Sequence, residues 1–204
     1  MAVSGEAVAV FVDKDGTLVD NVPFNVDPRH VRLLPGVLDG LAVLRDAGFR
    51  LFVVSNQPGV ALGRFPRAAL AVVEARIDEL LAAAGIALDG YAWCPHHPHG
   101  TVAAYATTCA CRKPKPGLLL QVAQRHRIVL ERSWMIGDIL DDVEAGHRAG
   151  CRAVLVDRGG ETEWQRGPAR EPDVYVDRFD EAARAIVATR AGATTVAPPS
   201  RLPA

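Results

Sequence analysis

Two carboxylates at the end of an apolar run are the first candidates for chemistry. Residues 8–20 read Val-Ala-Val-Phe-Val-Asp-Lys-Asp-Gly-Thr-Leu-Val-Asp, so Asp13 and Asp15 directly follow a β-branched segment that is typical of a strand buried on both faces. In an extended backbone, residues i and i+2 point the same way, so both carboxylates can reach one site. Such a pair suits a divalent cation, or a nucleophile beside a general acid. The alternative is a polar strand end with a turn at Asp and Gly.

Other polar residues follow the remaining apolar runs of the chain. In a parallel sheet, ligands bind beyond the carboxyl ends of the strands, so residues at those ends are expected to meet in one crevice. The candidates are Ser55, Asn56 and Gln57 after 49–54, Asp138 after 133–136, and Arg112 and Lys113 just before a helix that is expected to begin at Pro116.

This set of carboxylates, cations and hydroxyl groups suits phosphoryl transfer, because a phosphoryl group in transit spreads negative charge over its oxygens. Asp13 would be the nucleophile and would form a phosphoaspartate, while Asp15 would act as general acid and base. A Mg²⁺ held by Asp13, Asp138 and the Asp15 backbone carbonyl would keep the carboxylates from repelling one another. Ser55 and Lys113 would hold the phosphoryl oxygens.

Each of these residues also has a structural interpretation. The pair Ser55–Asn56 could be only a cap or a turn, and Lys113 could be a solvated charge. Asp138 and Asp141 could simply favour the first turn of the following helix through its dipole. Asp142, one turn further on, could orient the metal site. The expected placement of the whole set at one edge of the sheet favours the catalytic interpretation.

A second group of residues could bind zinc. Three cysteines and one histidine supply the sulfur and nitrogen ligands of a closed tetrahedral Zn²⁺ site, although gaps of one residue are tighter than the commonest spacing. Two further histidines compete for the nitrogen position, and reduced cysteines in an ordinary loop are the alternative. The expected ligands are Cys94, His96, Cys109 and Cys111, and the competing histidines are His97 and His99.

The composition indicates a soluble globular protein. The 204 residues are 49% hydrophobic and 23% charged, with a formal net charge of -1. This charge gives no support to binding of nucleic acid or of an acidic membrane, and residues 1–6 lack the basic start of a secretory signal. We expect one domain over residues 1–190, a disordered tail over 191–204, a monomer, and a cytoplasmic location.

Apolar runs alternate with amphipathic segments along the chain. This order predicts an α/β fold in which helices cover both faces of a parallel sheet. Residues 18–34 are expected to form a loop without regular structure, long enough to have a function. The expected strands are 8–12, 49–54, 90–93, 133–136, 152–156 and 174–176, and the expected helices are 36–47, 66–85, 116–126, 138–149 and 179–188.

Four segments resemble the motifs of the haloacid-dehalogenase (HAD) phosphatase superfamily, in the same order. They are Asp13-Lys-Asp-Gly-Thr17, Ser55-Asn-Gln57, Lys113 and Gly137-Asp138, and the resemblance covers roughly Val8 to Val156. Within this superfamily, the segment with the cysteines is similar to that of the D-glycero-D-manno-heptose 1,7-bisphosphate phosphatases. The histidinol-phosphate phosphatases are the nearest cousins of that group.

The resemblance implies a HAD-like Rossmannoid fold with a minimal cap loop at 18–34 and a zinc loop at 94–113. It implies the same roles for Asp13, Asp15 and Asp138 as the chemistry does, and it adds substrate recognition by Arg112. It also makes zinc the metal ion that the cysteine cluster is expected to bind. Asn56 and Gln57 would belong to the substrate-binding residues.

The activity that the resemblance implies is release of the 7-phosphate of the heptose bisphosphate, which leaves heptose 1-phosphate for the synthesis of nucleotide-activated heptose. Arg64, Arg112 and Lys115 could meet the second phosphate. The alternatives are a phosphatase for histidinol phosphate or another small sugar phosphate, and a phosphate-binding module without activity. Two residues depart from the family pattern: Lys14 stands where Arg is expected, and Ile139 stands where relatives often carry a basic residue.

Overall fold

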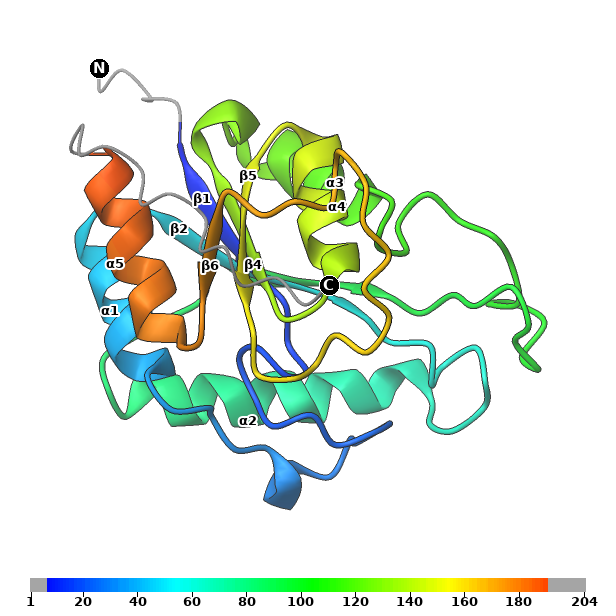
Figure 1. Cartoon of the computed structure of the whole chain (residues 1–204). Helices are drawn as coiled ribbons and strands as arrows, with labels where there is room; N and C mark the ends of the chain where they lie inside the picture. The colour runs from blue at the N-terminus through cyan, green and yellow to red at the C-terminus, as the bar shows by residue number, and fades with distance from the viewer. Residues whose placement is uncertain (1–6, 191–204) are drawn as a thin grey trace.

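A six-stranded, wholly parallel sheet forms the centre of the molecule in the computed structural model, which describes residues 7–190 (Figure 1). The strand order is β3-β2-β1-β4-β5-β6, so the first strand lies in the middle of the sheet. The predicted tail at 191–204 lies outside the described residues, and the boundary of the domain at residue 190 stays a prediction. The strands are β1 (Ala9–Val12), β2 (Arg50–Asn56), β3 (Gly90–Cys94), β4 (Trp134–Gly137), β5 (Arg152–Val156) and β6 (Val174–Val176).

Helices cover both faces of the sheet, as the alternation of segments predicts. The predicted helices are present, with ends that shift by a few residues. The largest shift is at Pro66, which precedes a short 3-10 turn (Arg67–Ala69) rather than opening the α-helix itself. The helices are α1 (Val37–Asp46), α2 (Leu70–Ala82), α3 (Gly117–His126), α4 (Leu140–Ala149) and α5 (Phe179–Arg190), with further 3-10 turns at Pro28–His30 and Leu130–Arg132.

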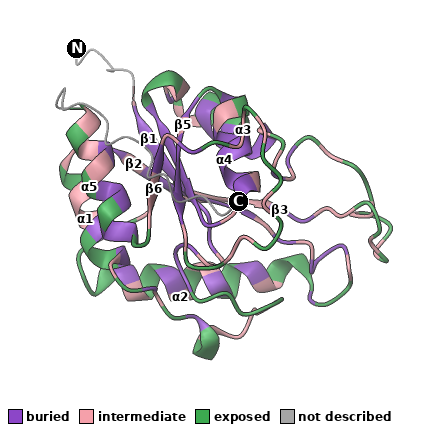
Figure 2. Cartoon of the chain, viewed as in Figure 1, coloured by how far each residue is buried: buried purple, intermediate pink, exposed green. Residues whose placement is uncertain are grey.

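Side chains of β1 alternate between two hydrophobic layers, one on each side of the sheet. Val10 and Val12 pack with α1, α2 and α5, whereas Ala9 and Phe11 pack with α3 and α4. Because both faces are covered, all four residues of β1 are fully buried, and Figure 2 shows the central strands as the most buried part of the chain. This double burial explains why the strand reads as a continuous apolar run in the sequence.

The loop at 18–34 differs from the expectation of a segment without regular structure. It contains the 3-10 turn at Pro28–His30, and isolated bridges join Val19 to Asp15 and to Leu33. Leu18 and Val19 are buried in the same layer as α1. The two ends of the loop are therefore anchored in the core, and its exposed residues lie between them, among them Phe24, which is 45% exposed.

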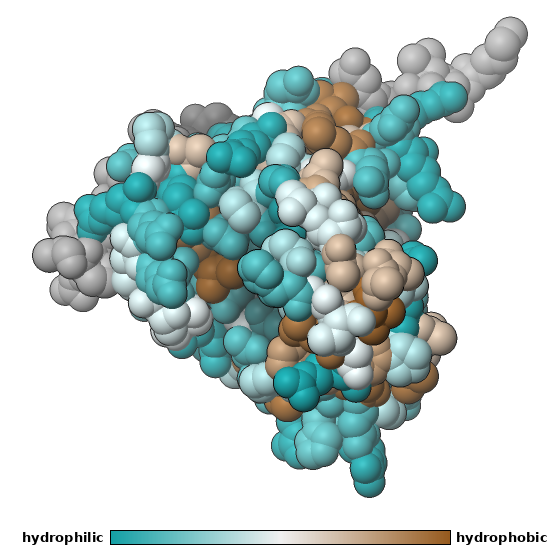
Figure 3. All heavy atoms as spheres, turned by 90° about the vertical axis from the view of Figure 1, so that its right-hand side faces the viewer, coloured by the Kyte–Doolittle hydropathy of each residue, from teal (hydrophilic) through white to brown (hydrophobic). Residues whose placement is uncertain are grey.

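Hydrophilic side chains dominate the face of the molecule in Figure 3, and hydrophobic ones form separate smaller patches. No helix within residues 7–190 has the length and apolar character needed to cross a bilayer.

Candidate active site and metal centres

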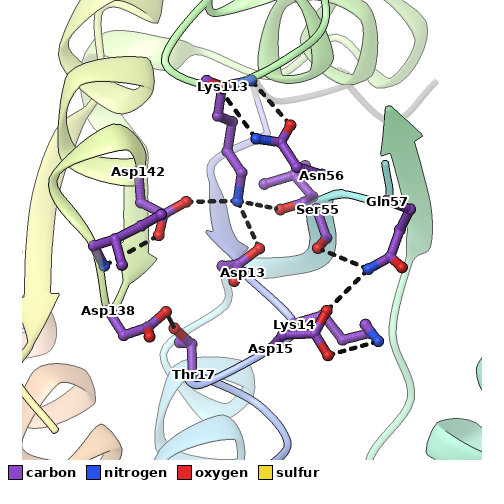
Figure 4. A network of polar contacts seen from close by, with 12 residues as sticks. Asp13, Lys14, Asp15, Thr17, Ser55, Asn56, Gln57, Lys113, Asp138 and Asp142 are labelled. Carbon is purple, nitrogen blue, oxygen red and sulfur yellow. Dashed lines mark hydrogen bonds and ion pairs between the residues drawn. The ribbon is translucent and has the colours of Figure 1, made fainter. Parts of the chain in front are cut away.

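The carboxyl ends of three neighbouring strands bring the predicted residues together. Asp13 follows β1 and Asp138 follows β4, and the backbone N–H of Asp13 donates to the Ile136 carbonyl over 2.9 Å. On the other side of β1, β2 ends with Ser55 and Asn56. Asp13 therefore lies at the middle of the sheet edge, flanked by groups from both neighbouring strands (Figure 4).

Two buried carboxylates contact one ammonium group at this point, and a third buried carboxylate lies close to them. The carboxylate oxygens of Asp13, Asp138 and Asp142 lie within 4.8 Å of one another. Lys113 Nζ lies 2.6 Å from Asp13 Oδ1 and 2.5 Å from Asp142 Oδ1, and it also donates to the Val54 carbonyl over 3.0 Å. Lys113 is only 2% exposed, so its charge is directed entirely into the site.

The crowding of charge has opposite effects on the acids and on the base. Burial and the neighbouring Asp13 and Asp142 raise the pKa of Asp138 to about 8. Burial and Asp13 likewise raise the pKa of Asp142 to about 7, although Lys113 opposes this change. Burial alone would lower the pKa of Lys113, but the Asp13 and Asp142 carboxylates outweigh it and raise that pKa. With all three carboxyl groups ionised, the site would carry more negative charge than one lysine can balance, and the raised pKa values of Asp138 and Asp142 express this cost.

This donor set fits a hard divalent cation. When all three carboxylates are ionised, they exceed the single ammonium by two negative charges, and oxygen ligands are those that Mg²⁺ prefers. The backbone passes unusually close to Asp138, because a Cβ on Gly16 would lie 2.2 Å, and one on Gly160 2.1 Å, from its Oδ2. Thr17 Oγ1 also donates to Asp138 Oδ1 over 3.0 Å. Asp138 is thus held in place by its surroundings.

Asp15 lies beside this group rather than in it. Its Oδ1 is 2.7 Å from Lys14 Nζ, and its Oδ2 accepts a hydrogen bond from Gln57 Nε2 over 2.9 Å. Burial raises the pKa of Asp15, and Lys14 opposes that shift. The carboxylate of Asp15 therefore takes no part in the three-carboxylate cluster, and its predicted contribution to a Mg²⁺ site is limited to its backbone carbonyl.

The two amides after Ser55 are engaged with protein groups. Asn56 binds the backbone of Lys113, accepting from its N–H over 3.0 Å and donating to its carbonyl over 3.1 Å. Gln57 Nε2 donates to Ser55 Oγ over 3.2 Å as well as to Asp15. Both residues were predicted to bind substrate, but here they connect other residues of the site.

The four residues predicted to bind zinc form one cluster. Cys94 Sγ lies 3.6 Å from Cys109 Sγ and 3.2 Å from Cys111 Sγ, and His96 Nδ1 lies 3.3 Å from Cys111 Sγ. With a Zn–S bond of about 2.3 Å, a tetrahedral site has sulfurs about 3.8 Å apart, so these separations are close to those of a zinc site. His97 is outside the cluster, where its Nδ1 accepts from the His99 N–H.

The cations predicted to meet a second phosphate have different surroundings. The Arg64 guanidinium lies over the ring of Phe24 in the loop at 18–34, 5.7 Å from its centre, and Lys115 Nζ donates to the Cys109 carbonyl. Arg112 Nη1 is buried and has no hydrogen-bond partner among the described residues. Of the three, Arg112 is the one with an unmet hydrogen-bonding requirement.

Comparisons with known proteins place the chain in a family. A family model described as HAD-hydrolase-like matches residues 110–182. A D-glycero-β-D-manno-heptose-1,7-bisphosphate 7-phosphatase from Yersinia pestis is 37% identical over 167 residues, which cover 79% of this chain and 86% of the relative. The chain belongs to this family of HAD phosphatases. A protein of the same name from Escherichia coli K12 is 37% identical over 74% of this chain and 80% of its own length.

Solved structures agree with membership of the HAD phosphatases. A HAD-like phosphatase from Mesorhizobium loti superposes with a TM-score of 0.79 and 33% identity, covering 90% of this chain and 87% of the other. The D,D-heptose 1,7-bisphosphate phosphatase of B. bronchiseptica, solved with magnesium and phosphate, has a TM-score of 0.75 at 29% identity, over 87% and 96% of the two chains. The chain is therefore a HAD-type phosphatase, a hydrolase of phosphoric monoesters.

Sequence reasoning missed three residues that touch the site directly. Lys14 was noted only as a departure from the family pattern, yet it is ion-paired with Asp15. Thr17 belongs to the first motif, and its hydroxyl was a visible signal. Gly160 gave no comparable signal, because it lies in the loop after β5 and only the folded chain brings it against Asp138.

Proposed function

We propose that this chain removes the 7-phosphate of D-glycero-D-manno-heptose 1,7-bisphosphate and leaves the heptose 1-phosphate. The observation that carries the proposal is the position of Asp13, a carboxylate at the middle of the sheet edge with Lys113 and two further carboxylates around it. The names of relatives at 37% identity support the choice of substrate.

Asp13 is the proposed nucleophile. One of its carboxylate oxygens attacks the phosphorus, the bond from phosphorus to the sugar oxygen breaks, and a phosphoaspartate results. Lys113 is proposed to stabilise the phosphoryl oxygens, and the 2.6 Å between its ammonium and Asp13 Oδ1 supports this role. The hydroxyl of Ser55, which is 2% exposed at the end of β2, is proposed as a second donor to the phosphoryl group.

Asp15 is the proposed general acid and base. In the first step it gives its proton to the departing sugar oxygen, and in the second it takes a proton from the water that attacks the phosphoaspartate. The second step breaks the bond between phosphorus and Asp13 and releases inorganic phosphate. Burial favours the protonated form of Asp15 that the first step requires, because it raises the pKa of this carboxyl.

Mg²⁺ would be held by Asp13 and Asp138, with the Asp15 carbonyl as a further ligand and Asp142 close by. When bound, it neutralises charge on the phosphoryl oxygens and on the carboxylates. Zinc in the cluster of Cys94, His96, Cys109 and Cys111 would have a structural role, since it leaves no open position when all four ligands bind.

Arg112 is proposed to recognise the substrate through its second phosphate. Its buried Nη1 has no hydrogen-bond partner in the described chain, and a guanidinium binds phosphate through paired hydrogen bonds. A bisphosphate would supply the missing acceptor. This contact favours the heptose bisphosphate over histidinol phosphate, which has a single phosphate.

The test is phosphate release from the heptose 1,7-bisphosphate, with histidinol phosphate and fructose 1,6-bisphosphate as comparison substrates. We expect the heptose bisphosphate to be hydrolysed with the highest kcat/KM, and chelation of Mg²⁺ to abolish turnover. The Asp13→Asn variant should lose at least about 10⁴-fold in kcat, because the amide is not a nucleophile.

Two results would contradict the proposal. Full activity in Asp13→Asn would exclude the phosphoaspartate, and a higher kcat/KM for histidinol phosphate would assign the chain to the cousin activity. Phosphate binding without turnover of any of the three substrates would favour the alternative of a non-catalytic phosphate-binding module.

A further inference from the structure

Lys113 lies in a segment without regular secondary structure. Residues 95–116 form neither a strand nor a helix, so Lys113 has no neighbouring strand to bind its backbone. Backbone N–H and carbonyl groups require partners when they are buried, and Lys113 is 2% exposed. The residue whose ammonium faces Asp13 therefore depends on side chains to fix its main chain.

Asn56 supplies both missing partners. Its Oδ1 accepts from the Lys113 N–H over 3.0 Å, and its Nδ2 donates to the Lys113 carbonyl over 3.1 Å. These two hydrogen bonds to one residue are equivalent to the pair that a residue of an adjacent strand would make. Asn56 and Lys113 are 57 residues apart in the sequence. Figure 4 shows the amide of Asn56 parallel to the backbone of Lys113, turned away from Asp13.

The side-chain ammonium of Lys113 is bound by the same strand, β2. Val54, two residues before Asn56 in β2, accepts a hydrogen bond from Lys113 Nζ over 3.0 Å. Backbone and ammonium are thus both attached to β2, which itself pairs with β1 up to the residue before Asp13. The distance between Lys113 Nζ and Asp13 is set through this connection.

We infer that Asn56 is a positioning residue, which fixes Lys113 against Asp13 and does not itself bind the sugar. The inference rests on the proposed role of Lys113 in holding the phosphoryl group. It assigns Asn56 a different task from the substrate contact predicted from the sequence. It also makes β2 a second anchor of the Lys113 segment, independent of the metal ligand Cys111.

The test compares Asn56→Ala and Asn56→Asp with the wild type. The Ala variant loses both hydrogen bonds, and the Asp variant keeps the size of the side chain but loses the donor to the Lys113 carbonyl. A displacement of a catalytic group by about 1 Å can cost about 100-fold in rate, so we expect a fall of this order in kcat/KM, carried mainly by kcat. The affinity for inorganic phosphate, measured by calorimetry with Mg²⁺ present, should fall as well.

Ser133→Ala is the matched control. The Ser133 hydroxyl also makes two bonds to the backbone, accepting from Ala9 N–H over 3.0 Å and donating to the Val129 carbonyl over 2.6 Å. It lies directly before β4, at the amino ends of the strands, whereas Asp13 lies at their carboxyl ends. This variant should lower the melting temperature and leave the kcat and phosphate affinity of the folded protein unchanged.

A double-mutant cycle with Lys113→Met separates positioning from direct binding. If Asn56 acts through Lys113, then Asn56→Ala should change phosphate affinity less than about 3-fold in the Lys113→Met background. An additive loss in the two backgrounds would overturn the inference, and so would wild-type kcat and phosphate affinity in folded Asn56→Asp. Because phosphate binding requires no heptose substrate, a failure to hydrolyse the heptose bisphosphate would count against the proposed function alone.

Discussion

The position of the Asp138 carboxylate is restricted by neighbouring residues that are not proposed to take part in the reaction. Gly16 and Gly160 approach its carboxylate so closely that neither has room for a methyl group, and Thr17 binds its other oxygen. Gly16 also has a φ of +85°, a conformation that disfavours side chains for a separate reason. The proposed metal ligand is therefore located by the backbone on two sides.

Replacing Gly160 by Ala should weaken metal binding more than it weakens the fold. The new Cβ would lie 2.1 Å from Asp138 Oδ2, and the carboxylate can move aside at little cost to stability. Its movement would disturb the proposed Mg²⁺ site, and changes next to metal ligands typically cost about 10-fold to 100-fold in affinity. The Mg²⁺ dependence of phosphatase activity measures this effect.

Gly167→Ala is the control for that experiment. Gly167 belongs to the same loop after β5, but a Cβ there would meet no atom within 4 Å. It should retain the wild-type dependence on Mg²⁺. Equal metal dependence in Gly160→Ala and the wild type would show that Asp138 does not hold the ion.

At the scale of elements, the loop with the cysteines connects the edge strand β3 to helix α3, and Lys113 lies near the end of this loop. Cys94 ends β3, and Cys109 and Cys111 come shortly before Lys113. Cys109→Ser should reduce bound zinc to well below one ion per chain, measured by atomic absorption on purified protein. It should also lower activity, because the ligands restrain the segment that precedes Lys113.

Cys151→Ala gives the comparison for the zinc experiment. Cys151 is buried in the layer that contains α3 and α4, and it is not one of the four residues whose sulfur and nitrogen atoms gather at the proposed zinc site. This variant should keep its zinc. Full zinc content in Cys109→Ser would contradict the assignment of the ligands.

The loop between β5 and β6 is attached to α4 by an ion pair that depends on pH. His147 Nε2 lies 2.8 Å from Asp173 Oδ2, and its Nδ1 lies 3.0 Å from the Ala169 carbonyl. The hydrogen bond to Asp173 raises the pKa of His147. Burial alone would raise the pKa of Asp173, but hydrogen bonds from His147 and the Ala153 N–H, helped by the charge of Arg152, lower it.

The stabilisation from this pair should be largest in weakly acidic solution. A histidine whose pKa is raised by folding stabilises the protein fully below the pKa of the unfolded state, about 6.5. This stabilisation is lost as the pH rises through the pKa of the folded state. An aspartate whose pKa is lowered by folding stabilises the protein above the pKa of the unfolded state, about 3.9. This stabilisation is lost as the pH falls through the pKa of the folded state. His147→Gln should therefore reduce the melting temperature most near pH 5 and least near pH 9. A difference from wild type that does not change with pH would contradict this account.

Local sequence patterns predicted the elements well, because burial imposes a period that can be read within a short window. The run around β1 and the stripe of α2 are examples. The same patterns could not show that the loop at 18–34 is anchored in the core through Val19, or that Asn56 binds the backbone of Lys113. Those contacts join residues whose neighbourhood depends on the path of the whole chain.

At the scale of the whole molecule, the buried charges of the site lower the stability of the fold. Three carboxylates share one buried cluster with one lysine, and their mutual repulsion destabilises the folded, metal-free protein most at a pH where Asp138, whose pKa is raised to about 8, is ionised. Asp138→Asn should therefore raise the melting temperature of the metal-free protein while abolishing most of its activity. Mg²⁺ should raise the melting temperature of the wild type and have much less effect on the variant. A variant that melts below the metal-free wild type would contradict this prediction.

The strand order also determines when the protein can become active during its synthesis. Strand β1 leaves the ribosome first and pairs with β2 soon afterwards, but its other neighbour, β4, begins only at Trp134. Until then one edge of the innermost strand is unpaired, and Asp13 lacks Asp138 and Asp142. At about 5–20 residues per second, roughly ten seconds separate the exit of the proposed nucleophile from that of its partners. A nascent chain is therefore both incomplete as an enzyme and open to pairing with other strands during this interval.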